Sequence, residues 1–418
     1  MDTANVNRLL FAKGLRAFGD GFVSLLLPLY LLELGYSALE VGIIASATLL
    51  GSGVLTLVVG LHAYRYHYRT LLLAAAVLMT GTGLSFALLT QFWPLLLIAF
   101  VGTLNPSSGD VSVFLPLEHA VLSRVVGSRQ RTATFARYSL VGTLVAALGS
   151  LAAGLPALLT GVAGWSPRVS LQIMFVAYAC LGLAAAAAYR GLPRALESGG
   201  PAVKAPLHRS KRIVYTLAAL FSLDAFGGGF VVQSMIALWL YQRFDMSLAT
   251  TGTIFFATGV LAAFSYLIAV RIANRIGLVN TMVVTHLPSN VLLMLIPLMP
   301  TLPLATLMLL LRFSISQMDV PTRQSYTMAV VPPAERAAAS GITGVARTTG
   351  AALSPLFAGL LFAHPSLINI PFYIAGSLKI AYDLLLFRSF RAIKPPEETA
   401  GTTLVVMFLC AACGAVFA

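Results

Sequence analysis

Charged side chains inside the apolar segments of the chain are the first candidates for chemistry. A charged group at the centre of a bilayer costs at least about 2.5 to 3.5 kcal/mol, so one that persists normally faces a partner or a water-filled path. We predict that seven such residues lie along a path for a solute or a proton. Asp20, Asp110 and Asp319 fall near the middle of their segments, and Arg16, Glu118, Asp224 and Arg323 fall nearer one end.

The segment 303–330 carries the most regular arrangement of polar residues. At about 100° per residue, Arg312, Ser316, Asp319 and Arg323 fall at roughly 0°, 40°, 340° and 20° around a helix. This stripe predicts either a buried salt-bridged seam between helices or a solute site. In the second interpretation Asp319 balances one arginine, and the other is available to an anionic or hydrogen-bonding group of the solute. Arg347 is interpreted either as a residue of the same path or as a clamp between helices.

Asp20 and Asp110 are placed on the predicted substrate and proton path, and Asp110 in particular is the predicted proton carrier. Arg16 is the only basic residue within a helical turn of either one in the sequence. A carboxylate that is desolvated inside the membrane suits the binding and release of a proton. The alternative for Asp110 is a hydrogen bond to a nearby serine or to a neighbouring helix. Lys379 and Asp383 lie one helical turn apart, and we expect them to neutralise each other.

The composition identifies the elements that must position these residues. Hydrophobic residues make up 58% of the chain and charged residues 10%, with a mean hydropathy of +0.88, which leaves too little polar surface for a soluble fold. Apolar runs long enough to cross about 30 Å of hydrocarbon follow one another. We predict an all-α membrane protein with twelve transmembrane helices. The expected spans are about 7–33, 38–61, 70–90, 94–123, 132–162, 169–190, 213–242, 247–270, 279–300, 303–330, 337–363 and 367–388.

The basic residues are distributed unevenly between the two sides of this topology. Nineteen of the 27 Lys and Arg residues fall on the side of the N-terminus, and only Arg168 and Arg243 fall in loops on the other side. The positive-inside rule therefore places the N-terminus in the cytoplasm. The net charge of +13 reflects this topology and does not indicate nucleic acid. The apolar run 402–418 could span, lie at the interface or be an appendage, and we expect it not to span because it is short.

Two pairs of segments show that the halves of the chain are related. Residues 16–23 and 224–231 are identical at six of eight positions, and residues 146–155 and 351–360 at seven of ten. The offsets are 208 and 205 residues. Repeated six-span units are a transporter architecture. We predict an N-terminal bundle over 1–190, a cytoplasmic linker over 191–212, a C-terminal bundle over 213–390 and a tail over 391–418.

The repeat places opposite charges at equivalent positions. Arg16 is equivalent to Asp224, and Glu118 is equivalent to Arg323. We predict that each of these two pairs forms a bridge between the halves near the cytoplasmic side, closed in one state and broken in the other. The three consecutive glycines at 227–229 predict close helix approach or local unwinding.

The chain resembles the major facilitator superfamily over about residues 7–390. The superfamily motif Gly-x3-Asp-Arg-x-Gly-x-Arg-Arg/Lys is matched after the second span by Gly60, Arg65 and Arg69, and after the eighth span by Arg275 and Gly277. Both copies lack the acidic residue. The Gly-Pro pattern that drug–proton antiporters of the family carry in the fifth span lacks its proline here.

The resemblance implies a secondary active transporter that works by alternating access, with spans one, four, seven and ten lining the central path. We expect a proton-coupled exporter of small amphipathic compounds, a monomer in the inner or plasma membrane. The alternatives are an importer or uniporter of a small metabolite and, on the same fold, a receptor or membrane enzyme. The sequence contains no metal-ligand cluster, nucleophile elbow or ATP-binding motif. It therefore predicts no enzymatic activity and no cofactor.

Overall fold

The computed structural model describes residues 3–62, 66–107, 112–126, 128–193, 207, 209–332 and 335–393. Within these ranges the secondary structure is helical and contains no strand. Predictions about Arg65, Asp110, most of the linker and the run 402–418 concern residues outside these ranges. The helices are α1 (Thr3–Glu33), α2 (Ala38–His62), α3 (Tyr68–Leu88), α4 (Phe92–Val101), α5 (Phe114–Val125), α6 (Ser128–Ala152), α7 (Leu155–Ala163), α8 (Pro167–Arg190), α9 (Lys211–Gly229), α10 (Gln233–Phe244), α11 (Leu248–Ile276), α12 (Leu278–Leu295), the short 3₁₀ helix η2 (Ile296–Leu298), α13 (Leu302–Ser316), α14 (Asp319–Ala329), α15 (Arg336–Phe362) and α16 (Ile370–Phe390).

Ten helical segments among the described residues are long and apolar enough to cross a membrane. They coincide with ten of the predicted spans and confirm the all-α membrane fold. The two remaining predicted spans are each divided into two shorter helices, α4 with α5 and α13 with α14. The first interruption contains Gly102 and Pro106, and a proline removes a backbone hydrogen bond from a helix. The count of twelve spans stays a prediction.

The sequence repeat is visible in the positions where helices begin. α5 begins at Phe114 and α14 at Asp319, which is an offset of 205 residues; α1 begins at Thr3 and α9 at Lys211, an offset of 208. The halves differ at the glycine-rich segment, because α1 is continuous whereas α9 ends at Gly229. A Cβ atom on Gly229 would lie 2.5 Å from the Ala351 carbonyl oxygen of α15. The glycines thus provide both the local unwinding and the close helix approach expected of them.

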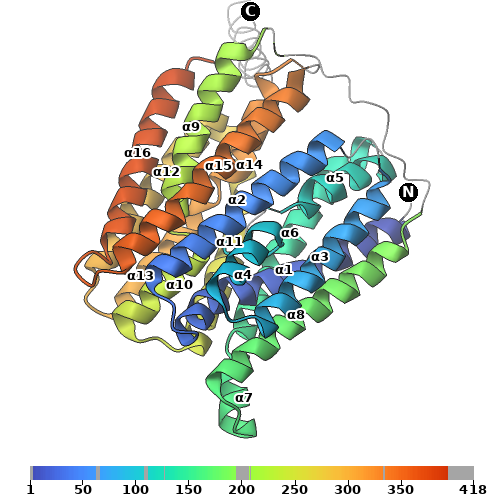
Figure 1. Ribbon diagram of the computed structural model, residues 1–418. Helices are drawn as coiled ribbons and strands as arrows, with labels where there is room; N and C mark the ends of the chain where they lie inside the picture. The colour runs from blue at the N-terminus through green and yellow to red at the C-terminus, as the bar shows by residue number, and fades with distance from the viewer. Residues whose placement is uncertain are drawn as a thin grey trace, which may run out of the picture.

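The two halves pack against each other near one side of the molecule, where α2 contacts α15 and α6 contacts α11. We call this the far side; the linker side is the opposite one, where α8 ends and α9 begins. Glycines permit the contact: a Cβ on Gly42 would lie 2.4 Å from the Pro355 carbonyl oxygen, and one on Gly252 would lie 2.3 Å from that of Ser150. The linker-side ends of α8 and α9 are well separated (Figure 1). The described halves are therefore closed together at the far side.

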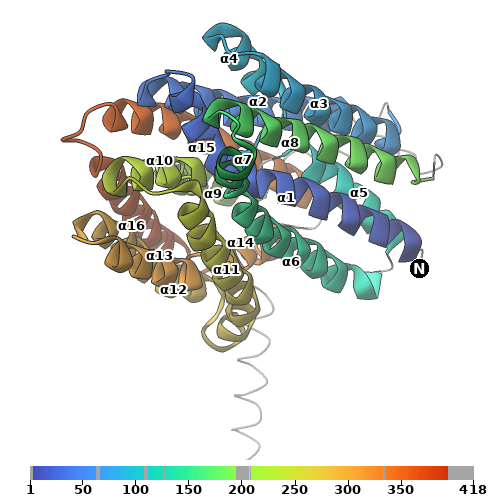
Figure 2. The same ribbon diagram turned by 90° about the horizontal axis from the view of Figure 1, so that it is seen from below.

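Hydrogen bonds also join the halves, and two of them have a backbone N–H group as the donor. The Leu356 N–H of α15 donates to Ser46 Oγ of α2 at 2.8 Å. The Ser234 N–H donates to the Pro106 carbonyl oxygen at 3.0 Å. The second bond links the interruption between α4 and α5 to the one between α9 and α10, so two breaks in helical structure meet between the halves. α10, α11 and α6 are seen together from this side in Figure 2.

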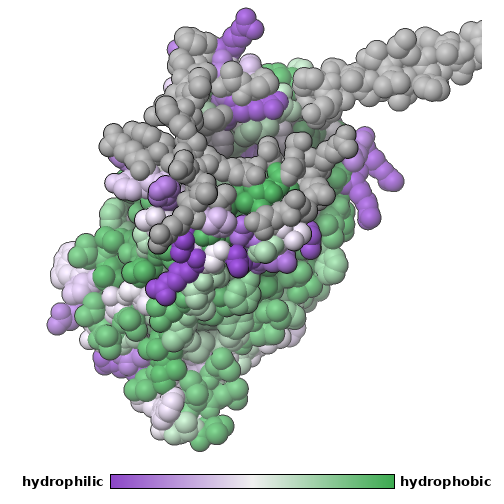
Figure 3. All heavy atoms as spheres, turned by 90° about the vertical axis from the view of Figure 1, so that its right-hand side faces the viewer, coloured by the Kyte–Doolittle hydropathy of each residue, from purple (hydrophilic) through white to green (hydrophobic). Residues whose placement is uncertain are grey.

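The outer surface of the bundle is largely apolar, as contact with lipid chains requires. Leu97, Val162 and Phe264 are among the large apolar side chains that are more than half exposed. In Figure 3 hydrophobic residues cover most of the visible lateral face, and many of the hydrophilic ones gather toward the linker side. A protein in water would not leave such an extended apolar surface uncovered. The surface is consistent with a multi-pass membrane protein.

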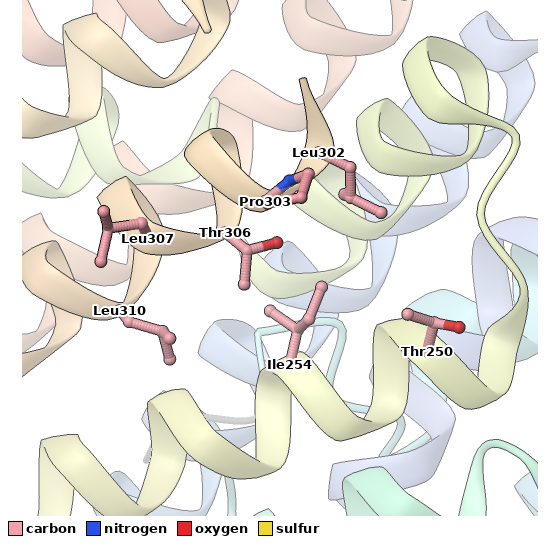
Figure 4. A pocket seen from close by; sticks show the side chains of 7 residues that line it. All are labelled: Thr250, Ile254, Leu302, Pro303, Thr306, Leu307 and Leu310. Atoms are coloured by element: carbon pink, nitrogen blue, oxygen red, sulfur yellow. The ribbon is translucent and has the colours of Figure 1, made fainter. Parts of the chain in front are cut away.

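A pocket of about 430 Å³ lies between α11 and α13 near the far side. Figure 4 shows its lining side chains, which come from these two helices alone. They are Thr250, Ile254, Leu302, Pro303, Thr306, Leu307 and Leu310. Because none of them is charged, this pocket is separate from the buried charged residues.

Candidate functional site

The N-terminal half contains a buried cluster formed by Arg16, Glu118, Tyr138 and Tyr189, which we call the Arg16 cluster. Arg16 Nη2 forms an ion pair with Glu118 Oε2, and the two side chains are 3% and 0% exposed. Arg16 Nε donates a hydrogen bond to the Tyr189 hydroxyl at 3.1 Å. Tyr189 and Tyr138 both donate to Glu118, the former at 2.6 Å. The carboxylate therefore accepts from three side chains, on α1, α6 and α8.

The C-terminal half contains a larger cluster centred on Asp224 of α9. Asp224 Oδ1 lies 2.6 Å from Lys379 Nζ, and Oδ2 accepts a hydrogen bond from Arg323 Nη1 at 3.2 Å. Arg347 Nη1 and His286 Nε2 approach the same carboxylate at 3.9 and 3.8 Å. One buried carboxylate is thus shared among basic side chains on four other helices. We call this the Asp224 cluster; its members are Asp224, His286, Asp319, Arg323, Arg347, Lys379 and Asp383.

The other two carboxylates of the Asp224 cluster have nearer partners of their own. Asp319 Oδ2 accepts a hydrogen bond from Arg323 Nη1 at 2.7 Å, so Asp319 pairs with one of the two arginines expected for it. Asp383 accepts from Asn290 Nδ2 at 2.9 Å and lies 2.8 Å from His286 Nδ1. The predicted Lys379–Asp383 pair is therefore wrong. Lys379 reaches α9 whereas Asp383 faces α12, because the two side chains contact different neighbouring helices.

Several polar atoms around the Asp224 cluster are buried without a hydrogen-bond partner. They are Arg312 Nε and Ser316 Oγ of α13 and Arg347 Nη1 of α15. Arg312 is 8% exposed, its guanidinium lies 4.9 Å from the Phe313 ring, and Asp224 acts on it electrostatically. A buried donor without a partner costs about 1 to 3 kcal/mol, and a charged one costs more.

The arrangement of helices is shared with a known family of membrane proteins. The model of the Major Facilitator Superfamily matches residues 9–318, which is more than half of the chain. The chain belongs to the Major Facilitator Superfamily. As a member of this superfamily it is a multi-pass membrane protein and a secondary transporter of small molecules, and not an enzyme.

Solved structures and one curated sequence resemble the chain over nearly its whole length. A bacterial homologue of the human lysosomal transporter Spinster, in an inward-facing and occupied conformation, has a TM-score of 0.74 at 14% identity and covers 92% of this chain and 96% of that chain. A D-xylose–proton symporter has a TM-score of 0.72 at 16% identity and covers 92% and 95%. The uncharacterised membrane protein YJR124C of Saccharomyces cerevisiae is 26% identical over an alignment of 423 positions, which covers 92% of this chain and 94% of that protein. The fold is therefore shared over both halves.

The four residues predicted to bridge the halves pair within the halves in this member of the superfamily. Arg16 pairs with Glu118, and Arg323 pairs with Asp224, so the bridges Arg16–Asp224 and Glu118–Arg323 are not formed in this structure. The reason is geometric. In each bundle the two equivalent positions face each other. The first position is basic in the N-terminal half (Arg16) and acidic in the C-terminal half (Asp224), and the second position has the opposite charge in each case. Opposite charges at equivalent positions therefore produce one pair in each half.

The remaining predicted residues lie apart from these contacts. Asp20 is half-buried in α1 and interacts electrostatically with Arg16 and Tyr178. Asp110 is outside the described residues. The loop-motif residues are near the linker-side helix ends: Gly60 in the last turn of α2 and Arg69 in the first turn of α3, with Arg275 and Gly277 at the end of α11. Gly277 has φ +86°, a conformation that favours glycine.

Some residues of the two clusters were not predicted. His286 and Asn290 lie one turn apart in α12, a helix without Asp, Glu, Lys or Arg, and this spacing could have marked them. Tyr138 and Tyr189 carry no such signal, because a tyrosine in an apolar helix is ordinary. Their role depends on which helices lie beside α5, and this cannot be read from one chain.

Proposed function

We propose that the chain is a proton-coupled secondary transporter of a small amphipathic solute that works by alternating access. Residues 1–190 and 213–390 would rock against each other, with the far-side contacts described above breaking in the other state. The observation that carries the proposal is the Asp224 cluster, in which one buried carboxylate balances basic groups from several helices. Arg312 and Arg347 are the residues we propose on the solute path.

A proton on Asp224 would change the charge balance of this cluster. Arg323 would keep Asp319 as a partner at 2.7 Å, but Lys379 would lose its partner at 2.6 Å and Arg347 its nearest one at 3.9 Å. Because a buried unpaired charge costs several kcal/mol, these groups would have to move or bind another anion. The charged and titratable groups facing Asp224 are His286 of α12, Arg312 of α13, Asp319 and Arg323 of α14, Arg347 of α15, and Lys379, Tyr382 and Asp383 of α16.

A movement of Lys379 and Arg347 in response to a proton would couple proton binding to the change between the two conformations. The affected basic groups are on α15 and α16, and α15 is also a helix through which the C-terminal half contacts the N-terminal half. A ligand or proton shifts a conformational equilibrium only through a difference in binding free energy between the two states. A change of partners at Lys379 and Arg347 would supply that difference. Asp20 and Asp110 are further proton carriers that we propose in the N-terminal half.

The direction of transport depends on whether the solute and the proton compete. Export, which the sequence predicts, requires a proton entering from outside to displace the solute. Uptake requires the two to bind together. With the N-terminus in the cytoplasm, as we propose, the linker side faces the cytoplasm and the far-side contacts close the external side.

The test is flux in proteoliposomes, measured with and without a pH gradient. A panel of organic anions, organic cations and neutral compounds is followed by mass spectrometry for the wild-type chain and for Asp224→Asn. We expect the gradient to accelerate wild-type flux of at least one compound about tenfold, and the variant to lose this dependence. Flux that ignores the gradient in the wild-type chain would contradict proton coupling.

Two further variants make the result interpretable. Asp245→Asn is the matched control, because Asp245 is exposed at the end of α10 and has φ +49°, which asparagine also tolerates. It should keep the full gradient dependence. Asp224→Asn could destabilise the chain by leaving Lys379 unpaired, so the double variant Asp224→Asn/Lys379→Gln is measured alongside. A monodisperse double variant that retains gradient-driven flux would overturn the role of Asp224.

A further inference from the structure

We propose that Arg347 and Arg312 bind an anionic group of the transported solute, so that the solute is a small organic anion. This inference rests on the proposed transport function and adds the chemical class of the substrate. It follows from three observations: the Asp224 cluster and Arg312 together carry four permanently charged basic groups and three carboxylates, some buried donors there have no partner, and Arg347 lies near the contact between the halves.

The carboxylates of the Asp224 cluster are already engaged by other side chains. Asp224 lies 2.6 Å from Lys379, and Asp319 lies 2.7 Å from Arg323. Asp383 is held by His286 and Asn290 at 2.8 and 2.9 Å. The nearest carboxylate oxygen to Arg347 is 3.9 Å away, which is beyond hydrogen-bonding distance. Of Arg312, Arg323 and Arg347, the arginines described in and beside this cluster, only Arg323 has a carboxylate within hydrogen-bonding distance.

Arg312 presents donors that nothing in its surroundings accepts. Its side chain is 8% exposed, and Nε has no hydrogen-bond partner. Ser316, one helical turn away on the same face of α13, is 5% exposed and its hydroxyl also has no partner. A guanidinium N–H beside a hydroxyl is the donor set that binds the oxygens of a carboxylate, phosphate or sulfonate. An anionic group would satisfy both donors.

Arg347 lies where a solute between the halves could reach it. The next residue, Thr348, contacts α2: a Cβ on Gly53 would lie 2.4 Å from the Thr348 methyl group. Gly350 lies against Ser222 of α9. This part of α15 is therefore between α9 and the opposite half. The Arg347 side chain is 35% exposed while its Nη1 is buried without a partner, so part of the guanidinium is held near Asp224 and part remains accessible.

The N-terminal half lacks an equivalent pair of arginines. At the repeat offset of 205 residues, Arg312 corresponds to Ser107 and Arg347 corresponds to Gly142. Lys13 occupies the space beside Gly142, but its ammonium lies over the Tyr138 ring at 5.1 Å. The proposed anion site is therefore a feature of the C-terminal half only.

The site predicts the sign of coupling. Asp224 is the acidic group nearest Arg347, and it also acts on Arg312, so its negative charge opposes the binding of a second anion there. Lys379 and Arg323 hold Asp224 in its charged form in this structure, so a proton binds only in a state in which these cations have moved away. In that state the proton removes the opposition. Solute and proton would therefore bind together, and an inward proton gradient would drive uptake. The anion site thus favours uptake over the export that the sequence predicts.

The test is ligand binding in detergent, where no gradient is needed. Thermal unfolding is recorded with 10 mM benzoate, citrate, glucose 6-phosphate, inorganic phosphate or sulfate, and with glucose and choline as neutral and cationic probes, at pH 5.5 and 7.5 and constant ionic strength. We expect at least one anion to raise the unfolding midpoint by several degrees, and more at pH 5.5. This shift should fall at least threefold in Arg347→Gln and in Arg312→Gln.

Matched variants separate binding from folding. Arg243→Gln removes an exposed arginine at the end of α10 and should keep the full shift. Arg347→Lys keeps the charge without the planar donor pair, so we expect an intermediate shift. A shift of equal size in Arg347→Gln and the wild-type chain, stabilisation by glucose or choline alone, or no anion effect at all would overturn the proposal. If anions bind but the pH gradient drives no flux, the anion site stands and the proton-coupled function fails.

Discussion

The two buried charge clusters occupy equivalent places in the two halves but differ in how completely their groups are paired. In the Arg16 cluster, Glu118 accepts from Arg16 and from two tyrosine hydroxyls. In the Asp224 cluster, one carboxylate balances several basic groups, and Arg312 and Arg347 have buried nitrogens without partners. Charge inside a membrane span is therefore not by itself a sign of function. A closed cluster holds helices together, whereas an incomplete one can bind a proton or a solute.

The difference between the clusters arises from a small number of substitutions between the repeats. Both halves place an acid and a base at the same two positions, 16 with 118 and 224 with 323. The C-terminal half adds basic groups at positions 312, 347 and 379 around this pair. The same half also adds the carboxylates Asp319 and Asp383, so the three added basic groups exceed the added carboxylates by one.

The largest effect should follow from breaking the closed cluster. Glu118→Gln leaves Arg16 buried without a counter-charge, and we expect a loss of about 3 to 5 kcal/mol in the free energy of unfolding. The measurement is thermal unfolding in detergent. Glu33→Gln, at the exposed end of α1, is the matched control and should unfold like the wild-type chain.

A double variant sharpens this result. Arg16→Met/Glu118→Met removes both charges and should recover much of the lost stability, because an apolar pair of similar size is a tolerated replacement for a buried ion pair. Since we regard this cluster as structural, the folded double variant should also retain pH-driven flux. Loss of flux in a stable double variant would mean that the Arg16 cluster is part of the transport mechanism.

A smaller stability effect should follow from the same kind of change in the open cluster. Lys379→Met leaves Asp224 with Arg323 at 3.2 Å and with Arg347 and His286 nearby, so we expect a loss of about 1 to 3 kcal/mol. Gradient-driven flux should nevertheless fall at least tenfold. Lys211→Met, exposed in the first turn of α9, serves as the control. Unchanged flux in a folded Lys379→Met variant would contradict the proposed role of the cluster.

The sequence predicts the architecture better than it predicts the contacts. The offsets of 205 and 208 residues anticipate that α5 and α14, and α1 and α9, begin at equivalent positions, because both follow from one repeat. The charged residues of the clusters also stand out, since charge in an apolar helix is rare. The sequence does not show which of these residues pair with each other. Lys379 and Asp383 are one turn apart yet contact α9 and α12, and Arg16 pairs with Glu118 and not with Asp224. Pairing depends on the rotation of neighbouring helices, which a single sequence does not record.

The central proposal is that the charge on Asp224 controls the binding of an anion at Arg312 and Arg347. The decisive measurement is the affinity of the most stabilising probe anion as a function of pH, for the wild-type chain and for Asp224→Asn. We predict that acidification tightens binding to the wild-type chain at least tenfold, and that Asp224→Asn binds tightly with little dependence on pH, because it imitates the protonated carboxyl group. Weaker binding to Asp224→Asn, or an unchanged pH dependence in that variant, would contradict the account.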